Sequence, residues 1–162
     1  MSLAAFEPEV LALAQDLRAR ALRVATAESC TGGLIAAACT AVAGSSDWFE
    51  RGFVTYSNAA KVELLGVDGA LLQAHGAVSE AVARAMAEGA LQRAPVQRAV
   101  AVTGIAGPGG AVPGKPVGTV WLALARSDAP TQAWRLQLPG DRAAVREATV
   151  HAALRALRQS LR

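Results

Sequence analysis

The sequence predicts an α/β protein, a three-layer α/β/α sandwich built on a mixed sheet. Early in the 162-residue chain, short apolar runs alternate with segments of helical periodicity. Two further apolar runs then follow each other directly, as in an antiparallel hairpin. Hydrophobic residues make up 52% of the chain but aromatic residues only 4%, so small side chains let helices pack closely onto the sheet. We expect residues 1–162 to form one domain with a sizeable core.

The helices are expected from apolar spacing and from the residues at their starts. Glu7-Pro8-Glu9 opens the first helix, with Pro in the first turn and acidic residues at the positive end of the helix dipole. Val10, Leu13 and Leu17 form its apolar stripe. Further helices are expected over 34–43, over 58–65 with Ser57-Asn58 as the cap and Gly66 as the end, from Ser79-Glu80 to about Arg93, and from Arg142 to about Arg158.

The strands are expected where short apolar runs end at turn residues, namely over 24–27, 53–56, 99–103, 119–125 and 132–138. The run 99–103 is continuously apolar and ends at Gly104, which is typical of a strand buried on both faces. Residues 127–130 are expected to form the hairpin turn. His75 is expected in a loop, and a Gly/Pro-rich loop is expected over 104–118.

Charge and composition exclude several classes of protein. The net charge is +3 and the pI is near 9.4, but the C-terminal arginines follow a helical pattern without interleaved aromatic residues. This favours a solvated helix face, with an anionic small substrate as second choice, and argues against nucleic-acid binding. There is no signal-peptide pattern and no membrane-length apolar run. Cys30 and Cys39 match no zinc spacing. We expect a cytoplasmic protein with reduced thiols, no membrane or nucleic-acid partner, and a homo-oligomeric state.

The most informative stretch is Ala27-Glu28-Ser29-Cys30-Thr31-Gly32-Gly33, between an expected strand and an expected helix. A serine at such a junction has its hydroxyl beside the free N–H groups of a helix start, which favour an anion or a developing oxyanion. The turn therefore offers a nucleophile and a site for negative charge together. Cys30 is a second, less favoured nucleophile.

Ser29 needs a base, because a free hydroxyl is hardly ionised at neutral pH. His75 and His151 are candidates, although a surface position is the simpler interpretation for His151. Lys61 is the third candidate, one of only two lysines in the chain. Burial in an apolar pocket would lower its pKa and make it a base, whereas composition alone favours an exposed lysine. The residues leave this choice open.

A possible phosphate site follows the run 99–103. The loop from Thr103 to Gly110 begins at the carboxyl end of an expected strand, where open α/β sheets bind ligands. Its glycines let backbone N–H groups approach a phosphate closely, although it is neither a Walker motif nor a dinucleotide-binding fingerprint. Asp141-Arg142 at the start of the last helix adds a possible phosphate clamp.

Over about residues 8–158 these motifs together resemble the CinA C-terminal-domain family. The motifs that carry the resemblance are Ala27–Gly33, Gly44-Ser45-Ser46, Tyr56-Ser57-Asn58 with Lys61, 75–80, 103–108, 115–120 and 139–142. The stand-alone members of that family are nicotinamide mononucleotide deamidases, which release ammonia and nicotinate mononucleotide in pyridine nucleotide salvage. The larger members carry an additional N-terminal domain.

The resemblance implies roles for individual residues. Ser29 takes the place of the family's nucleophile, Lys61 that of its base, and Tyr56 that of an active-site tyrosine. The implied substrate-binding residues are Thr31, Gly32 and Gly33 as oxyanion donors, together with Asn58, Thr103, Gly104 and Arg142. The resemblance implies no cofactor and no metal ion. The alternative is a nucleotide-binding module without chemistry, associated with competence or DNA repair.

Overall fold

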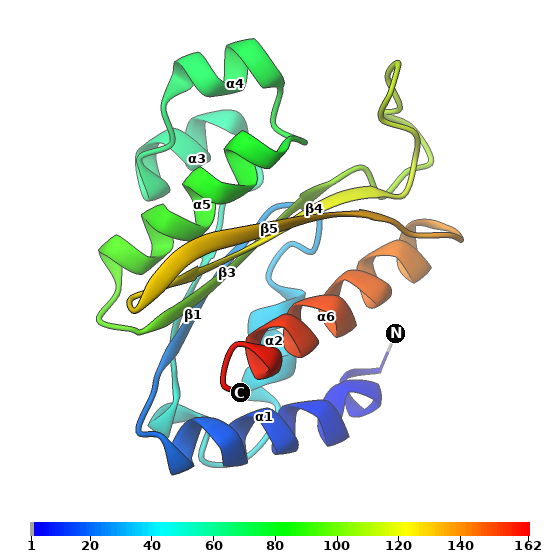
Figure 1. Cartoon of the computed structure of the whole chain (residues 1–162). Helices are drawn as coiled ribbons and strands as arrows, with labels where there is room; N and C mark the ends of the chain where they lie inside the picture. Colours follow the sequence, from blue (N-terminus) through cyan, green and yellow to red (C-terminus); the bar gives the residue numbers. More distant parts are fainter. Residues whose placement is uncertain (1) are drawn as a thin grey trace.

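The computed structural model describes residues 2–162 and has a five-stranded mixed sheet between two layers of helices (Figure 1). The strands, in their order across the sheet, are β2 (Phe49–Val54), β1 (Val24–Glu28), β3 (Arg98–Gly104), β4 (Thr119–Arg126) and β5 (Ala129–Gln137). The pairs β1–β2 and β1–β3 are parallel, whereas β3–β4 and β4–β5 are antiparallel. The predicted three-layer sandwich with a mixed sheet and a late hairpin is confirmed.

The helices divide between the two faces of the sheet. One layer holds α1 (Glu7–Ala19), α2 (Leu34–Thr40) and α6 (Arg142–Gln159), and the opposite layer holds α3 (Asn58–Leu65), α4 (Gly69–His75) and α5 (Glu80–Arg93). Two short 3-10 helices occupy Leu3–Phe6 and Ser45–Asp47. Within residues 2–162 no helix is both long enough and apolar enough to cross a bilayer.

The central strands present side chains of different size to the two layers. Toward α1 and α6 they place larger side chains, namely Val100, Val102, Leu122 and Leu124. Toward α5 they place mainly alanines, namely Ala99, Ala101, Ala123 and Ala125, with Trp121 at one end of β4. Alternation along a strand separates the two sets. The alanine face lets α5 approach the sheet closely, and Gly89 on α5 leaves no room for a Cβ against the Leu65 carbonyl of α3. In this way α3 is held close to the sheet.

Several predicted boundaries were wrong. The second strand is Phe49–Val54 rather than 53–56, because β2 is a half-exposed edge strand whose charged residues hide the apolar alternation. The helix expected over 34–43 ends at Thr40, and Val42 turns back into the core. His75 ends a helix, α4, which the sequence analysis missed. Pro130 lies within β5, an edge strand, where a missing N–H group is tolerated.

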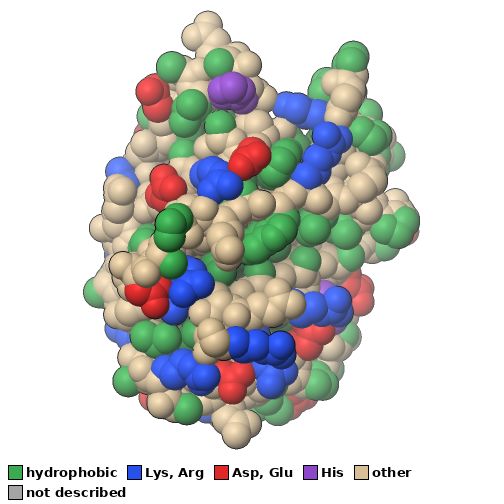
Figure 2. All heavy atoms as spheres, viewed as in Figure 1, with side chains coloured by type: hydrophobic (Ala, Val, Ile, Leu, Met, Phe, Trp, Pro, Cys, Tyr) green, Lys and Arg blue, Asp and Glu red, His purple; other side chains and the backbone are tan. Residues whose placement is uncertain are grey.

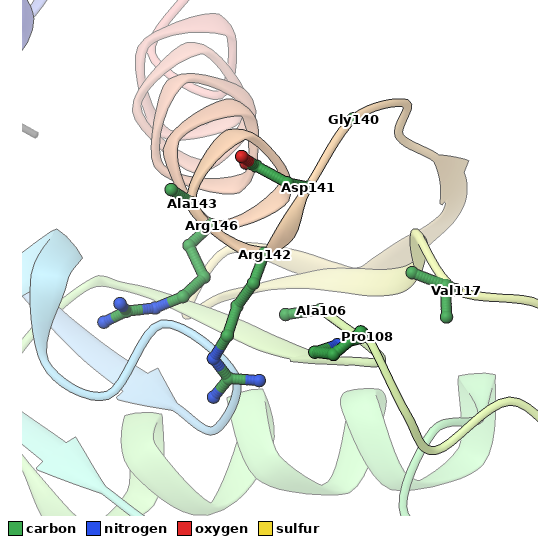
Figure 3. A pocket seen from close by; sticks show the side chains of 8 residues that line it. All are labelled: Ala106, Pro108, Val117, Gly140, Asp141, Arg142, Ala143 and Arg146. Atoms are coloured by element: carbon green, nitrogen blue, oxygen red, sulfur yellow. The ribbon is translucent and has the colours of Figure 1, made fainter.

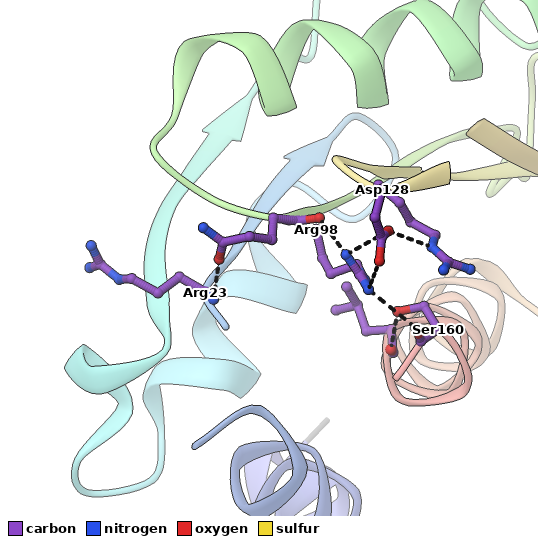
Figure 4. A network of polar contacts seen from close by, with 7 residues as sticks. Arg23, Arg98, Asp128 and Ser160 are labelled. Carbon is purple, nitrogen blue, oxygen red and sulfur yellow. Dashed lines mark hydrogen bonds and ion pairs between the residues drawn. The ribbon is translucent and has the colours of Figure 1, made fainter. Parts of the chain in front are cut away.

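A buried arginine ties three elements together at the end of the sheet where β3 begins (Figure 4). Arg98 is 5% exposed, and its guanidinium donates to the Gln97 carbonyl (2.9 Å), to the Asp128 carboxylate in the β4–β5 turn (3.2 Å) and to the Ser160 carbonyl after α6 (3.5 Å). Asp128 also accepts from Arg126. The network therefore joins the hairpin to the end of α6.

The Asp128 carboxylate should make folding stability depend on pH. Arg126 and then Arg98 hold its pKa below the ordinary value of 3.8, so its stabilising effect is complete above pH 3.8 and is lost as pH falls through the lower folded value. Asp128→Asn should therefore lower the thermal midpoint at pH 7 and reduce its fall between pH 7 and pH 3. The control is Glu88→Gln, since the exposed Glu88 makes no side-chain hydrogen bond or ion pair within residues 2–162. Equal pH dependence in wild type and Asp128→Asn would contradict this assignment.

Candidate active site

The candidate site lies where β1, β2 and β3 end. Ser29 follows β1, Thr55 and Tyr56 follow β2, and Thr103 and Gly104 close β3. These ends meet because the three strands are parallel. They surround a pocket of about 230 Å³, lined by Ser29, Cys30, Tyr56, Lys61, Ala77, Val78, Thr103, Gly104, Ala106 and Arg142.

The turn that carries Ser29 is anchored by Glu28, which the sequence analysis did not single out. The Glu28 carboxylate is fully buried and accepts from the Ile35 and Ala36 amides at the start of α2 (2.8 and 2.9 Å). It also accepts from the Thr31 hydroxyl (2.7 Å) and the Thr26 hydroxyl (3.2 Å). The anion site predicted at this helix start is therefore filled by the chain's own carboxylate.

The backbone of the turn leaves a different set of amides free. Gly32 and Gly33 adopt left-handed conformations, with φ of 59° and 97°, which glycine accepts without strain. The Gly32 amide donates to the Ser29 carbonyl (3.0 Å), so the expectation that it binds an oxyanion does not fit this geometry. Within residues 2–162 the Cys30, Thr31 and Gly33 amides donate to no oxygen, and Cys30 also lines the pocket.

Lys61 faces Ser29 from α3. Its Nζ lies 3.1 Å from the Ser29 Oγ, 2.7 Å from the Thr55 carbonyl oxygen and 3.4 Å from the Tyr56 carbonyl oxygen. Only 1% of Lys61 is exposed, so the exposed lysine favoured by composition is not what the structure shows. Burial lowers its pKa from the ordinary 10.5. The structure thus brings a nucleophile and a desolvated amine within hydrogen-bond distance.

The other candidates for base and nucleophile lie apart from this pair or are inactive. His75 is exposed at the end of α4 and lines a separate hollow. His151 lies on α6, 3.1 Å from the Glu9 carboxylate of α1. Cys30 borders the pocket, but burial raises the pKa of its thiol to about 11, which keeps the thiol protonated at neutral pH.

Arg142 closes one side of the pocket. It donates to the exposed Tyr56 hydroxyl (3.2 Å) and to the Gly107 carbonyl (2.9 Å). Its helix start is capped by Asp141, which accepts from the Ala144 amide (2.9 Å). Beyond Arg142 lies a second cavity of about 720 Å³, which Figure 3 shows with the side chains of Arg142 and Arg146 extending from α6. The two cavities share Ala106 and Arg142.

The prediction that the C-terminal arginines form a solvated helix face holds for only some of them. Arg155 and Arg158 pair with Glu9 and Asp16 of α1 at the surface, whereas Arg142 and Arg146 turn toward the site. On the face shown in Figure 2, cationic and anionic side chains are interspersed. Sequence periodicity could not separate the two pairs, because all four arginines lie on one helix.

The remaining predicted residues have varied positions. Thr103 lines the pocket, and its hydroxyl donates to the Ala77 carbonyl (2.9 Å). Gly104 also lines it, but a Cβ there would lie 2.6 Å from the Val120 side chain, so packing explains this glycine. Asn58 is exposed and borders a different hollow. Within residues 2–162 no three His, Cys, Asp or Glu side chains are grouped as metal ligands.

A sequence model of the CinA C-terminal domain matches residues 8–161. The chain belongs to the CinA C-terminal domain family. A nicotinamide-nucleotide amidohydrolase PncC of Shigella flexneri is 53% identical, and the match covers 90% of this chain and 88% of that protein. A putative competence-damage inducible protein of Symbiobacterium thermophilum is 59% identical over 87% of this chain but only 35% of its own length. The chain thus spans about a third of the longer relatives and most of the shorter ones.

Solved structures of the family share the fold. The competence/damage inducible protein CihA from Agrobacterium tumefaciens has a TM-score of 0.93 and 46% identity, covering 96% of this chain and 94% of that chain. The competence damage-inducible protein A from Klebsiella pneumoniae has a TM-score of 0.91 and 41% identity, with 95% of each chain covered. The sandwich described above is therefore the fold of CinA-superfamily proteins.

Replacing Glu28 should loosen the Ser29 turn and the start of α2. Glu28→Gln keeps the side-chain volume but removes the carboxylate charge. Its amide NH₂ group would also face hydroxyl and backbone N–H groups that themselves donate hydrogen bonds. We expect the free energy of unfolding in urea to fall by about 2–4 kcal/mol. Thr31→Val, which removes only one of the four donors, should cost about 1 kcal/mol. A Glu28→Gln protein as stable as wild type would show that this carboxylate is not the anchor of the turn.

Proposed function

We propose that this chain is an amidohydrolase domain that converts nicotinamide mononucleotide to nicotinate mononucleotide and ammonia, in pyridine nucleotide salvage. The observation that carries the proposal is the 3.1 Å separation of Lys61 Nζ and Ser29 Oγ in a pocket at the strand ends. A relative matched over most of its length, the Shigella flexneri protein, is named for this activity.

In the proposed mechanism, neutral Lys61 takes the proton of the Ser29 hydroxyl as Oγ attacks the carboxamide carbon. The carbonyl π electrons move to oxygen, and the free amides of Cys30 and Thr31 are the proposed oxyanion donors. The tetrahedral intermediate collapses as Lys61 returns the proton to the departing nitrogen, which leaves as ammonia. Lys61 then takes a proton from a water molecule as the water oxygen attacks the acyl carbon. The bond from that carbon to Oγ breaks, Lys61 returns the proton to Ser29 Oγ, and nicotinate mononucleotide is released.

The lining of the pocket suits a flat ring with an anionic tail. Its apolar lining residues are Ala77, Val78 and Ala106, and it also contains Arg142, which is exposed and shared with the neighbouring cavity. We propose that the nicotinamide amide points to Ser29 and the phosphate to Arg142, whose planar guanidinium suits phosphate oxygens. Tyr56 holds Arg142 in place. Asn58, on the outer surface, has no role in this proposal.

The free, buried thiols of Cys30 and Cys39 support the further proposal of a cytoplasmic enzyme. A homo-oligomer also stays part of the proposal, supported by the partly exposed Trp134 on the edge strand β5. The competing function is a nucleotide-binding module without chemistry, and binding alone does not require the contact between Lys61 and Ser29. It predicts binding of the mononucleotide without product.

Ser29→Ala should abolish turnover, because burial keeps the thiol of Cys30, the other candidate nucleophile at the pocket, protonated. Ammonia release from nicotinamide mononucleotide should fall by at least roughly 10³-fold, while the Kd for the mononucleotide stays near that of wild type. Cys39→Ser serves as a control, since Cys39 is buried away from the pocket. Undiminished ammonia release by Ser29→Ala would remove Ser29 from the mechanism, and binding without turnover by wild type would favour the binding module.

Lys61 should link both rate and stability to pH. Because its folded pKa lies below 10.5, the rate should rise with pH along a limb centred below 10.5. The folded state also binds fewer protons than the unfolded state between the two pKa values, so stability rises with pH across that interval. Lys61→Met fills the same space without a titrating group, so it should fold, lose turnover and lack this rise in stability.

Two measurements check this assignment. One is the rate of ammonia release by wild type across the alkaline range. The other is the difference in unfolding free energy between wild type and Lys61→Met at several pH values. Wild-type turnover in Lys61→Met, or a constant difference in stability, would show that Lys61 is not the base.

A further inference from the structure

Arg146 reaches the Ser29 turn from a distant part of the sequence. It lies one helical turn after Arg142 on α6, and Figure 3 shows both guanidiniums extending from that helix. Its Nε lies 3.2 Å from the Cys30 carbonyl oxygen, and its Nη2 lies 3.0 Å from the Thr31 carbonyl oxygen. The side chain is half-buried. Two consecutive carbonyls of the turn thus share one guanidinium.

We propose that Arg146 is a positioning residue that orients the oxyanion-binding amides beside Ser29. The proposal rests on the function proposed above but adds a residue that the mechanism does not otherwise use. It is carried by the geometry of the peptide planes, in which the C=O and N–H of each trans peptide point in opposite directions. Fixing a carbonyl on one side therefore fixes the amide on the other side.

Two connections run from Arg146 to the amides near Ser29. The Cys30 carbonyl belongs to the same peptide as the Thr31 amide, so the bond from Nε sets the Thr31 N–H directly. The Thr31 carbonyl shares its peptide with the Gly32 amide, which donates to the Ser29 carbonyl at 3.0 Å. That carbonyl in turn shares its peptide with the Cys30 amide. Arg146 therefore fixes the orientation of the Cys30 and Thr31 amides, the two proposed oxyanion donors, and hydrogen bonds in such a chain also polarise one another.

The opposing sides of the turn carry opposite charges. Glu28 holds the Thr31 side chain and the start of α2, while Arg146 holds the carbonyls of Cys30 and Thr31. The planar fork of arginine can meet two adjacent carbonyls at once, which the ammonium of lysine does less well. A Cβ at Gly32 would lie 3.8 Å from Arg146 Nη2, an ordinary contact distance, so the left-handed φ of 59° rather than this contact favours glycine there.

The positions of the two arginines predict different kinetic effects. Nε and Nη2 of Arg146 already donate to the turn, whereas Arg142 lines the Ser29 pocket itself. Loss of a positioning group weakens binding of the transition state more than binding of substrate and so lowers kcat. Loss of a phosphate contact weakens binding of the substrate and of the transition state equally, and so raises KM without changing kcat.

The test compares Arg146→Met, Arg146→Lys and Arg142→Met by steady-state ammonia release from nicotinamide mononucleotide. Arg146→Met should lower kcat by roughly 10- to 100-fold with KM within about twofold of wild type, since losing an oxyanion donor outright costs roughly 10²–10³. The kcat of Arg146→Lys should lie between those of Arg146→Met and wild type. This variant takes the place of Arg146→Met if Arg146→Met does not fold. Arg142→Met should mainly raise KM. Arg155→Met, on the exposed part of the same helix, should match wild type.

A second readout does not depend on activity. Exchange of the Gly32 amide hydrogen, followed by NMR, should be at least about tenfold faster in Arg146→Met and unchanged in Arg155→Met. A raised KM with unchanged kcat, or unchanged Gly32 exchange in Arg146→Met, would overturn the positioning role. If wild type releases no ammonia, the proposed function fails, and Gly32 exchange still decides whether Arg146 orders the turn.

Discussion

The site depends on one buried carboxylate. Glu28 is the last residue of β1, and its side chain accepts the amides that begin α2. The strand and the helix are therefore joined by a short turn whose direction is set by hydrogen bonds to a charged acceptor. Such bonds are worth more than neutral ones, and a buried carboxylate without them would be strongly unfavourable. Ser29 comes directly after this anchor, so its position follows from that of Glu28.

The second requirement is that α3 lies close to the strand ends. Alanines on β3 and β4 let α5 approach the sheet, and Gly89 lets α3 approach α5. A larger side chain at these positions would move α3 outward and take the Lys61 amine away from Ser29. Small residues distant from the chemistry thus determine whether the two reacting groups meet, which explains why the core is rich in alanine and poor in aromatic residues.

Local patterns predicted the Ser29 turn and the caps of three helices, because each is specified by a few neighbouring residues. Ser57, Ser79 and Asp141 all accept from the amides of their own helices as caps do. The sequence could not predict that Lys61 is buried, since that depends on packing between α3 and α5. It also could not show that Glu28 fills the helix start or that Arg146 reaches the turn. Glu28 meets partners three to eight positions later in a turn, and Arg146 meets the turn from another helix. Neither kind of contact produces a periodic pattern of residues in the sequence.

The arrangement of charge explains how a lysine can act here without a histidine or an aspartate. Lys61 Nζ contacts only uncharged oxygens, those of Ser29, Thr55 and Tyr56. A carboxylate beside it would stabilise the ammonium form and remove the base at neutral pH. The nearest carboxylate in sequence to Ser29, Glu28, instead turns away into α2, where amides and hydroxyls satisfy it. The same feature that anchors the nucleophile therefore keeps its negative charge from pairing with the amine, so that burial alone determines the direction of the Lys61 pKa shift.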